Sequence, residues 1–273
     1  MSLRVGHICY LNSIPFFHHL RRQGFAGEIV SGVPAHLNAM LARGEIDLCP
    51  SSSFEYARNW RDYLLLPEQS ISSFGPVRSV LLFSRKKLSE LDGQVIAVTG
   101  ESATSINLLK VLLREFHGCR EVCCRVPDEP VEAIVERGGD VLMIGDRALK
   151  AGLATDGGVY DLGQLWWEAT GLPFVFALWI VRREVAEERP GELAAFNCQL
   201  AAARTSAEGD LHSLASEVAC PDWLTEEELV AYWQRMSFDL AGDHLRGLER
   251  YFSLCHRHGL LAEEPGIAFF SAA

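Results

Sequence analysis

The sequence predicts an α/β fold built from two similar lobes, and two observations lead to it. Short apolar segments typical of buried strands alternate with helical segments along the 273 residues, which favours mostly parallel sheets. Residues 34–57 and 130–151 repeat one order of elements: a helix, a glycine stop, an aspartate, an apolar strand and a second capped helix. A pattern that recurs after about ninety residues predicts two lobes of one design, with chance similarity between two such units as the alternative.

The first and last elements can be placed from local signals. Residues 4–10 are predicted to form the first strand, and Asn12 and Pro15 lie in a stretch typical of a loop that opens a helix. Near the other end, Thr225 and Glu228 have the spacing of a capping box, which predicts a helix beginning there. We expect the helices of this last part to pack on lobe one, and we assign them no chemical role.

Two apolar segments are predicted to carry the chain between the lobes. Residues 79–83 form the first of these strands and residues 173–181 the second. Lobe one is therefore expected to contain 1–85 plus 179–273, and lobe two 86–178. Because clefts between lobes are favoured places for small-molecule sites, a ligand is expected there.

Composition excludes several classes of partner. The net charge is -11 and no basic stripe is present, which argues against nucleic acid. No apolar run reaches the roughly 18 residues of a membrane-spanning helix, and the first residues do not resemble a secretion signal. The eight cysteines show neither C-x-x-C pairs nor zinc-site spacing, so we expect buried free thiols in a reducing compartment. A cytoplasmic protein without a membrane or nucleic-acid partner is predicted.

The segment "VTGESATSINLLKVLL" places hydroxyl residues between an apolar strand and an apolar-faced helix. The first N–H groups of a helix lack internal partners and lie at the positive end of its dipole, so they can bind a small anion. Serine and threonine are also ordinary N-caps, and both interpretations stay open. Ser51 and Ser52 precede another predicted helix in the same manner. The candidates on the first helix are Ser102, Ala103, Thr104 and Ser105.

Five motifs in order resemble one enzyme family. They are "VGHICYLNSIPFF", "VPAHLNAMLARGEIDLCPSSSFEYARN", "YLLLPEQSISSFGPVRSVLLFS", "VTGESATSINLL" and "WWEATGLPFVFALW". Together they look like chorismate dehydratase of the futalosine route to menaquinone. The resemblance implies a two-lobed fold similar to the periplasmic binding proteins of the second topological type. It also implies a hydro-lyase, without cofactor or metal, that converts the dicarboxylate chorismate to 3-[(1-carboxyvinyl)oxy]benzoate.

The resemblance also assigns roles to individual residues. Asn12 in "YLNSIP" and Ser79 in "GPVRSV" match the family residues that touch the reacting substrate. Asn12 is expected to bond near the departing hydroxyl, and Ser79 to position the enolpyruvyl side or relay a proton. Thr170 and Gly171 are expected near the ligand. Arg78 is a strand neighbour of Ser79, so it is expected to face away if Ser79 faces the cleft, with a carboxylate clamp as the alternative.

The base that removes the ring proton is open between two candidates. His7 lies in the first predicted strand, where a histidine is more often a packed core residue than a base. The alternative is that the enolpyruvyl carboxylate of the substrate takes the proton while the protein orients it, and we favour this interpretation. The competing functions are the sister synthase of 1,4-dihydroxy-6-naphthoate in the same pathway and a non-enzymatic binding protein for a small anion.

Overall fold

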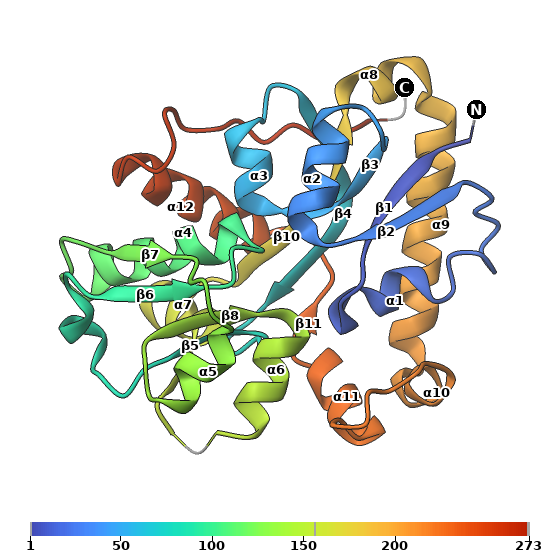
Figure 1. Ribbon diagram of the computed structural model, residues 1–273. Coiled ribbons are helices and arrows are strands. Elements are labelled where there is room, and N and C mark those ends of the chain that lie inside the picture. The colour runs from blue at the N-terminus through green and yellow to red at the C-terminus, as the bar shows by residue number, and fades with distance from the viewer. Residues whose placement is uncertain (1, 156, 272–273) are drawn as a thin grey trace. The chain divides into compact units, whose positions relative to one another are not determined.

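Two separate β-sheets organise the chain, whose computed structural model describes residues 2–155 and 157–271 (Figure 1). Each sheet belongs to one compact unit. Unit 1 consists of Met1–Ile71, Phe176–Ala241 and Pro265–Ala273. Unit 2 consists of Ser72–Val175 and Gly242–Glu264. The chain is thus an α/β protein of two units, as the sequence predicts.

The sheet of unit 1 has the strand order β11-β4-β10-β3-β1-β2. β1 pairs in parallel with β2 and β3, whereas β10 runs antiparallel to β3. The strands are β1 Arg4–Ile8, β2 Glu28–Gly32, β3 Leu48–Ser52, β4 Tyr63–Ser73, β10 Phe174–Arg182 and β11 Met236–Ser237. The predicted first strand is confirmed, two residues shorter than expected.

Helices cover both faces of this sheet because its side chains alternate between them. Val5 belongs to the core that α1 and α9 complete with Phe16 and Phe196. Gly6 points to the other face, where a Cβ atom would lie 2.9 Å from Ile46 and 3.4 Å from Leu37 of α2. The helices are α1 Ile14–Phe17, α2 Pro34–Ala42, α3 Ser53–Arg58, α8 Arg183–Glu188, α9 Pro190–Gly209, α10 Leu211–Glu217 and α11 Glu226–Trp233.

The sheet of unit 2 has the order β7-β6-β8-β5-β9. β6 pairs in parallel with β7 and β8, whereas β5 runs antiparallel to β8 and β9. Its strands are β5 Val80–Phe83, β6 Val95–Val98, β7 Cys123–Arg125, β8 Val141–Ile144 and β9 Val159–Asp161. Its helices are α4 Ala103–Val111, α5 Val131–Glu136, α6 Gly145–Leu153, α7 Leu162–Thr170 and α12 Asp243–Arg257, with short turns η2 Leu88–Leu91 and η3 Leu112–Phe116.

The predicted repeat is confirmed by the strand orders. Across the sheet of unit 1 the strands lie in the order β2-β1-β3-β10-β4. The first strand in the chain, β1, lies between the second and the third, and the antiparallel strand β10 lies between the third and the fourth. Unit 2 has the same arrangement in β7-β6-β8-β5-β9. The two helix-strand-helix segments that the sequence aligns become α2-β3-α3 and α5-β8-α6. One design is therefore used twice.

The unit boundaries differ from the sequence-based ones. The chain changes units inside β4 and again inside β10, and β5, expected in lobe one, pairs within the sheet of unit 2. The expectation that every C-terminal helix packs on lobe one is wrong for α12. Its Tyr251 hydroxyl donates to the carbonyl of Thr104 at 3.2 Å, and Arg257 pairs with Glu115 at 2.7 Å. An amphipathic pattern shows which face of a helix is buried, but not the element that buries it.

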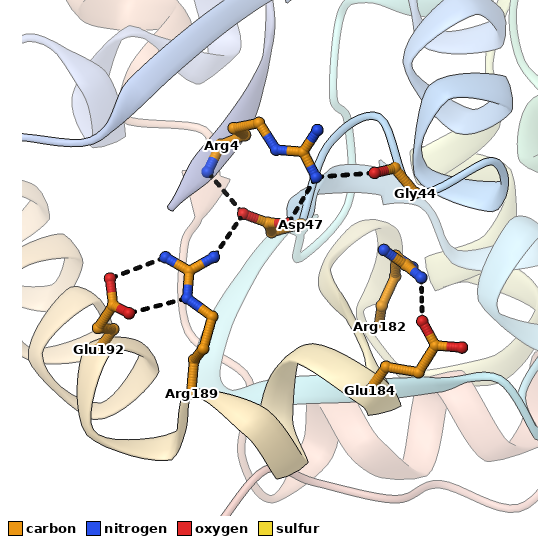
Figure 2. A network of polar contacts seen from close by, with 7 residues as sticks. All are labelled: Arg4, Gly44, Asp47, Arg182, Glu184, Arg189 and Glu192. Atoms are coloured by element: carbon orange, nitrogen blue, oxygen red, sulfur yellow. Dashed lines mark hydrogen bonds and ion pairs between the residues drawn. The ribbon is translucent and has the colours of Figure 1, made fainter. Parts of the chain in front are cut away.

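A buried aspartate directly precedes β3 in unit 1 and β8 in unit 2. It lies at the amino ends of the parallel strands, opposite to the edge that carries the candidate site residues. Asp47 accepts from the backbone N–H of Arg4 at 2.8 Å, and its carboxylate pairs with the guanidinium groups of Arg4 at 3.0 Å and Arg189 at 3.1 Å (Figure 2). In unit 2 the carboxylate of Asp140 accepts from the Ser84 hydroxyl at 2.7 Å and from Lys86 at 2.6 Å. These contacts tie the start of β1 in unit 1, and the segment between β5 and η2 in unit 2, to the aspartate that precedes β3 or β8.

Two further sequence predictions concern the environment of the chain. None of the helices in the described ranges is both long and apolar enough to cross a membrane. All eight cysteines lie in those ranges and none forms a disulfide. The expectation that the thiols are buried is wrong for Cys9, Cys123 and Cys198, which are exposed.

Candidate active site

Polar residues gather at the carboxyl ends of the parallel strands in each unit. Ligands of open α/β sheets bind at this edge, because the loops that follow the strands meet there. In unit 1, β1 and β3 are parallel neighbours with Val5 opposite Leu48, so the turns after these two strands share an edge. Asn12 lies in the first turn, and Ser51 and Ser52 lie at the second.

Neighbouring groups hold the turn that carries Asn12. The turn is a single 3-10 turn, Leu11–Ser13, directly before α1. The Ser13 hydroxyl donates to the carbonyl of Ile8 at 2.6 Å, and the indole N–H of Trp233 donates to the carbonyl of Leu11 at 2.8 Å. Asn12 is partly exposed, and its amide makes no hydrogen bond to any of the described residues. The side chain is therefore placed by its neighbours and available to a ligand.

His7 supports the same turn from the strand. Its Nε2 lies 3.3 Å from the Ser13 hydroxyl oxygen, and its ring lies on that of Phe17 with centroids 4.0 Å apart. Because the Ser13 proton is used toward Ile8, this arrangement assigns the Nε2 proton to the histidine as donor. Burial lowers the pKa of His7 below its usual 6.5, which keeps the ring neutral at pH 7.

Ser51 and Ser52 are engaged in internal contacts. Ser51 is fully buried and its hydroxyl donates to the side-chain oxygen of Asn38 at 2.7 Å. Ser52 is the N-cap of α3 and accepts from the N–H of Glu55 at 3.3 Å. The Glu55 carboxylate lies in the first turn of this short helix and pairs with Arg58. These contacts favour structural roles for both serines.

Ser79 lies at the corresponding edge of unit 2. Because β5 is antiparallel to β8, with Val80 opposite Ile144, the residue that precedes β5 lies at the carboxyl end of β8. The Ser79 carbonyl accepts from the N–H of Gly145 at 2.8 Å. Its side chain is 2% exposed, and its hydroxyl lies 3.5 Å from the carbonyl of Val77, at the limit of a hydrogen bond. A buried hydroxyl with such a weak partner can take a stronger one from a ligand.

Arg78 has an unusual backbone. Its φ is 61°, in the left-handed region, which costs a residue with a Cβ atom about 1–2 kcal/mol. The prediction that Arg78 points away from Ser79 assumed strand geometry, and it does not apply because β5 begins only at Val80. The Arg78 side chain is exposed, and its backbone N–H donates to the carboxylate of Asp161 at 2.6 Å.

The helix start that follows β6 shares this edge, since β6 and β8 are parallel with Val98 opposite Leu142. Ser102 is the N-cap of α4 and accepts from the N–H of Ser105 at 3.3 Å, which confirms its capping role. The Ser105 hydroxyl lies 3.2 Å from that of Ser102. A cap uses one of the four terminal N–H groups, so anion binding by this terminus stays a prediction.

Two other sequence assignments take a different form in the structure. Thr170 and Gly171 end α7: the Thr170 hydroxyl donates to the carbonyl of Trp166 at 2.7 Å, and Gly171 adopts a φ of 66°. Gly171 is thus the C-cap of α7, and contact of these two residues with a ligand stays a prediction. In the repeated segment 130–151 the residue with the cap signal in the sequence is Asp146, but α6 begins at Gly145, so Asp146 lies in the first turn.

Two residues that support the site were not found from the sequence. Trp233 bonds to a residue 222 positions away, and Asp161 bonds to one 83 positions away. Asp161 precedes a helix, which is a visible N-cap signal, but nothing in that signal indicates a second segment held by the same carboxylate. Such pairings are created by the fold.

The fold and the site define a two-unit α/β protein with polar groups at the strand ends suited to a small ligand. Comparison with known families then identifies it: residues 3–257 match the menaquinone biosynthesis family, and the chain belongs to that family. It is 40% identical to chorismate dehydratase of Thermus thermophilus over 191 residues, which cover 64% of this chain and 68% of that protein. It is 34% identical to chorismate dehydratase of Campylobacter jejuni over 178 residues, 63% of this chain and 64% of that protein, slightly under two thirds of the latter.

Solved structures agree on the fold. The alkanesulfonate-binding protein of Xanthomonas axonopodis pv. citri superposes with a TM-score of 0.71 at 19% identity, covering 97% of this chain and 95% of that one. The periplasmic aliphatic sulphonate binding protein of Escherichia coli gives 0.66 at 17% identity, covering 100% and 92%. A protein of Archaeoglobus fulgidus gives 0.68 at 20% identity, covering 95% and 98%. The architecture is therefore that of periplasmic binding proteins.

Proposed function

We propose that this chain is a chorismate dehydratase, a hydro-lyase that acts in menaquinone biosynthesis. The observation that carries the proposal is the 40% identity to the Thermus enzyme, within a family match that spans residues 3–257. The similarity to sulfonate-binding proteins concerns the fold alone and carries no activity, since one fold hosts many functions.

The reaction removes one water from chorismate and gives 3-[(1-carboxyvinyl)oxy]benzoate. The C–H bond at the ether-bearing ring carbon breaks first, and its electron pair is delocalised toward the ring carboxylate. The neighbouring C–O bond then breaks, the hydroxyl leaves as water with a proton, and the new double bond makes the ring aromatic. No electrons are exchanged with a second reactant, so the proposal includes no redox cofactor. The protein has to orient the substrate and stabilise developing charge.

Asn12 and Ser79 are the residues to which we assign contact with the reacting atoms. The amide of Asn12 can donate to the departing hydroxyl, and it has no competing hydrogen bond within the described residues. The hydroxyl of Ser79 has only its 3.5 Å contact with Val77 to give up, so it can bond to the enolpyruvyl side or relay a proton. The start of α4, Ala103–Val111, is proposed to bind a carboxylate of the substrate.

We propose that the enolpyruvyl carboxylate of the substrate itself takes the ring proton. The contacts of His7 give it a structural role in the turn of Asn12, because its Nε2 donates to Ser13 and its ring is packed on Phe17, which leaves only Nδ1 with a lone pair. A His7→Asn variant should then keep turnover within about tenfold of the wild type. A fall of about 10²–10⁴ with unchanged substrate binding would instead assign the base to His7.

A cytoplasmic location and a small dicarboxylate as the only partner complete the proposal. Eight cysteines without a disulfide fit a reducing compartment. The net charge of -11 gives no electrostatic support for binding to nucleic acid.

The test is to incubate the purified protein with chorismate and to follow the products by mass-resolved chromatography. An aromatic product lighter than chorismate by one water, formed over many turnovers, is the expected result. Unchanged chorismate together with a raised melting temperature would mean that the protein binds this ligand without converting it. Conversion of the cyclised futalosine derivative in place of chorismate would assign the sister activity.

A further inference from the structure

The turn before Ser79 is held in a conformation that its own residues disfavour. Arg78 adopts a φ of 61°, one of two left-handed conformations at non-glycine residues in the described ranges. Such geometry persists only where the surroundings fix it, and it is enriched at functional sites. The question is which group fixes this one.

The carboxylate of Asp161 does so with both of its oxygens. Oδ2 accepts from the N–H of Arg78 at 2.6 Å, and Oδ1 accepts from the N–H of Val77 at 3.1 Å. Oδ1 also caps α7, accepting from Gly163 at 2.9 Å and Gln164 at 3.2 Å. One side chain therefore ties the turn before Ser79 to the start of a helix.

The start of α7 is built for this close contact. A Cβ atom on Gly163 would lie 2.5 Å from the carbonyl oxygen of Gly75 and 2.9 Å from the hydroxyl of Ser73, so no larger residue fits there. Ser79 is then fixed from both sides, since the N–H groups before it are held by Asp161 and its own carbonyl accepts from Gly145.

Burial raises the pKa of the Asp161 carboxyl, and the four backbone N–H groups oppose this rise only in part. A raised pKa means that the ionised form is less favourable in the folded protein than in the unfolded chain. The four backbone N–H donors are therefore what holds the ionised carboxylate in this buried place.

We propose that Asp161 is a positioning residue that holds the Val77–Ser79 turn in its left-handed conformation and so places the Ser79 hydroxyl for the reaction. This inference rests on the proposed function, because it takes Ser79 to be in contact with the substrate. Asp161 itself touches no reacting atom: both of its oxygens are directed to backbone N–H groups.

The test separates two functions of Asp161, the N-cap of α7 and the hydrogen bonds to the turn before Ser79. Serine is a good N-cap, but its short side chain cannot reach the N–H groups of the turn, so Asp161→Ser keeps α7 and releases residues 77–78. The expected result is a kcat lower by about 10- to 100-fold with a KM changed less than threefold, and a circular dichroism spectrum like that of the wild type. Asp161→Asn is the second variant, in case the serine variant does not fold. The matched control is Asp210→Ser, since Asp210 caps α10 through Ser213 and is exposed.

A rescue variant makes the test specific. Glycine adopts a positive φ without a steric penalty, so Arg78→Gly should relieve the effect of Asp161→Ser. With the kcat of the Arg78→Gly single variant as the reference, the double variant should recover at least a third of the kcat that Asp161→Ser loses. Three results would overturn the inference. The kcat could be unchanged in both Asp161→Ser and Asp161→Asn, or it could fall equally in the Asp210→Ser control. The third is that the effects of the two substitutions on kcat are purely additive in the double variant. If the wild type itself gives no aromatic product from chorismate, the proposed function fails first and the inference fails with it.

Discussion

The two units use one strand order, yet they place their reactive candidates at positions that do not correspond. Asn12 follows the first strand of unit 1, and the matching turn of unit 2 is the start of α4 with its capping Ser102. Ser79 precedes the antiparallel strand of unit 2. The register of β10 on β3, with Ala177 opposite Ser52, puts Phe176 at the matching position of unit 1.

The means of holding these residues differ as well. Uncharged groups, the Ser13 hydroxyl and the Trp233 indole, hold the turn of Asn12, whereas a carboxylate holds the turn of Ser79. The repeat therefore gives each unit a similar edge at its strand ends, and the two units differ in the polar residues that they place at that edge. A comparison of equivalent positions in the two units would therefore not identify Asn12 and Ser79.

The largest effect is expected from the two residues themselves. Asn12→Ala and Ser79→Ala should each lower turnover by about 10²–10³-fold, the range for losing one hydrogen-bond donor to the transition state. Initial rates with chorismate measure this, with melting temperatures to show that each variant is folded. Ser206→Ala, which removes an exposed helical hydroxyl, is the control. Near-native turnover in both alanine variants would remove the assignment.

The second expectation concerns the paired aspartates at the opposite edge. Asp47→Ala removes the carboxylate that two partly buried arginines share, leaving Arg4 with the Gly44 carbonyl and Arg189 with Glu192, and should lower the free energy of unfolding by about 2–3 kcal/mol. Asp140→Ala should cost about 1–2 kcal/mol, because it has one cation and Lys86 is well exposed. Urea unfolding compares the two. A larger loss for Asp140→Ala would contradict this ranking of the two units.

A smaller effect is expected from Trp233→Phe. The change keeps an aromatic ring but leaves the carbonyl of Leu11 without its indole donor, which should cost about 1 kcal/mol and lower kcat severalfold. Trp179→Phe is the matched control, because the buried indole N–H of Trp179 has no hydrogen-bond partner in the described part of the chain. Equal losses of turnover in the two variants would show that ring volume, and not the bond to Leu11, matters.

The smallest effect is a pH dependence of stability that belongs to His7. Burial lowers the pKa of His7 in the folded protein, so the unfolded chain binds the proton more readily. The stability that neutral His7 contributes is therefore fully present above the usual pKa of 6.5, and it is lost as the pH falls through the lower pKa of the folded protein. The decrease in melting temperature from pH 8 to pH 5 should be smaller in His7→Asn than in the wild type. An identical fall in both proteins would show that His7 does not contribute.

Local signals in the sequence predict much of the fold. The capping box of Thr225 and Glu228, the strand before Asn12 and the repeated helix-strand-helix segments are all present in the structure. These features depend on residues close together in the chain. The partner of α12, the left-handed turn at Arg78 and the hold of Asp161 on that turn depend on distant segments. For this reason the sequence indicates Asn12 and Ser79 through a family resemblance but not the residues that position them.

Chorismate that carries deuterium at the ether-bearing ring carbon distinguishes the proposed elimination of water from other reactions. The expected product is aromatic, keeps the enolpyruvyl group and has lost this deuterium. An aromatic product that retains the deuterium, or the absence of any aromatic product, would contradict the proposed elimination.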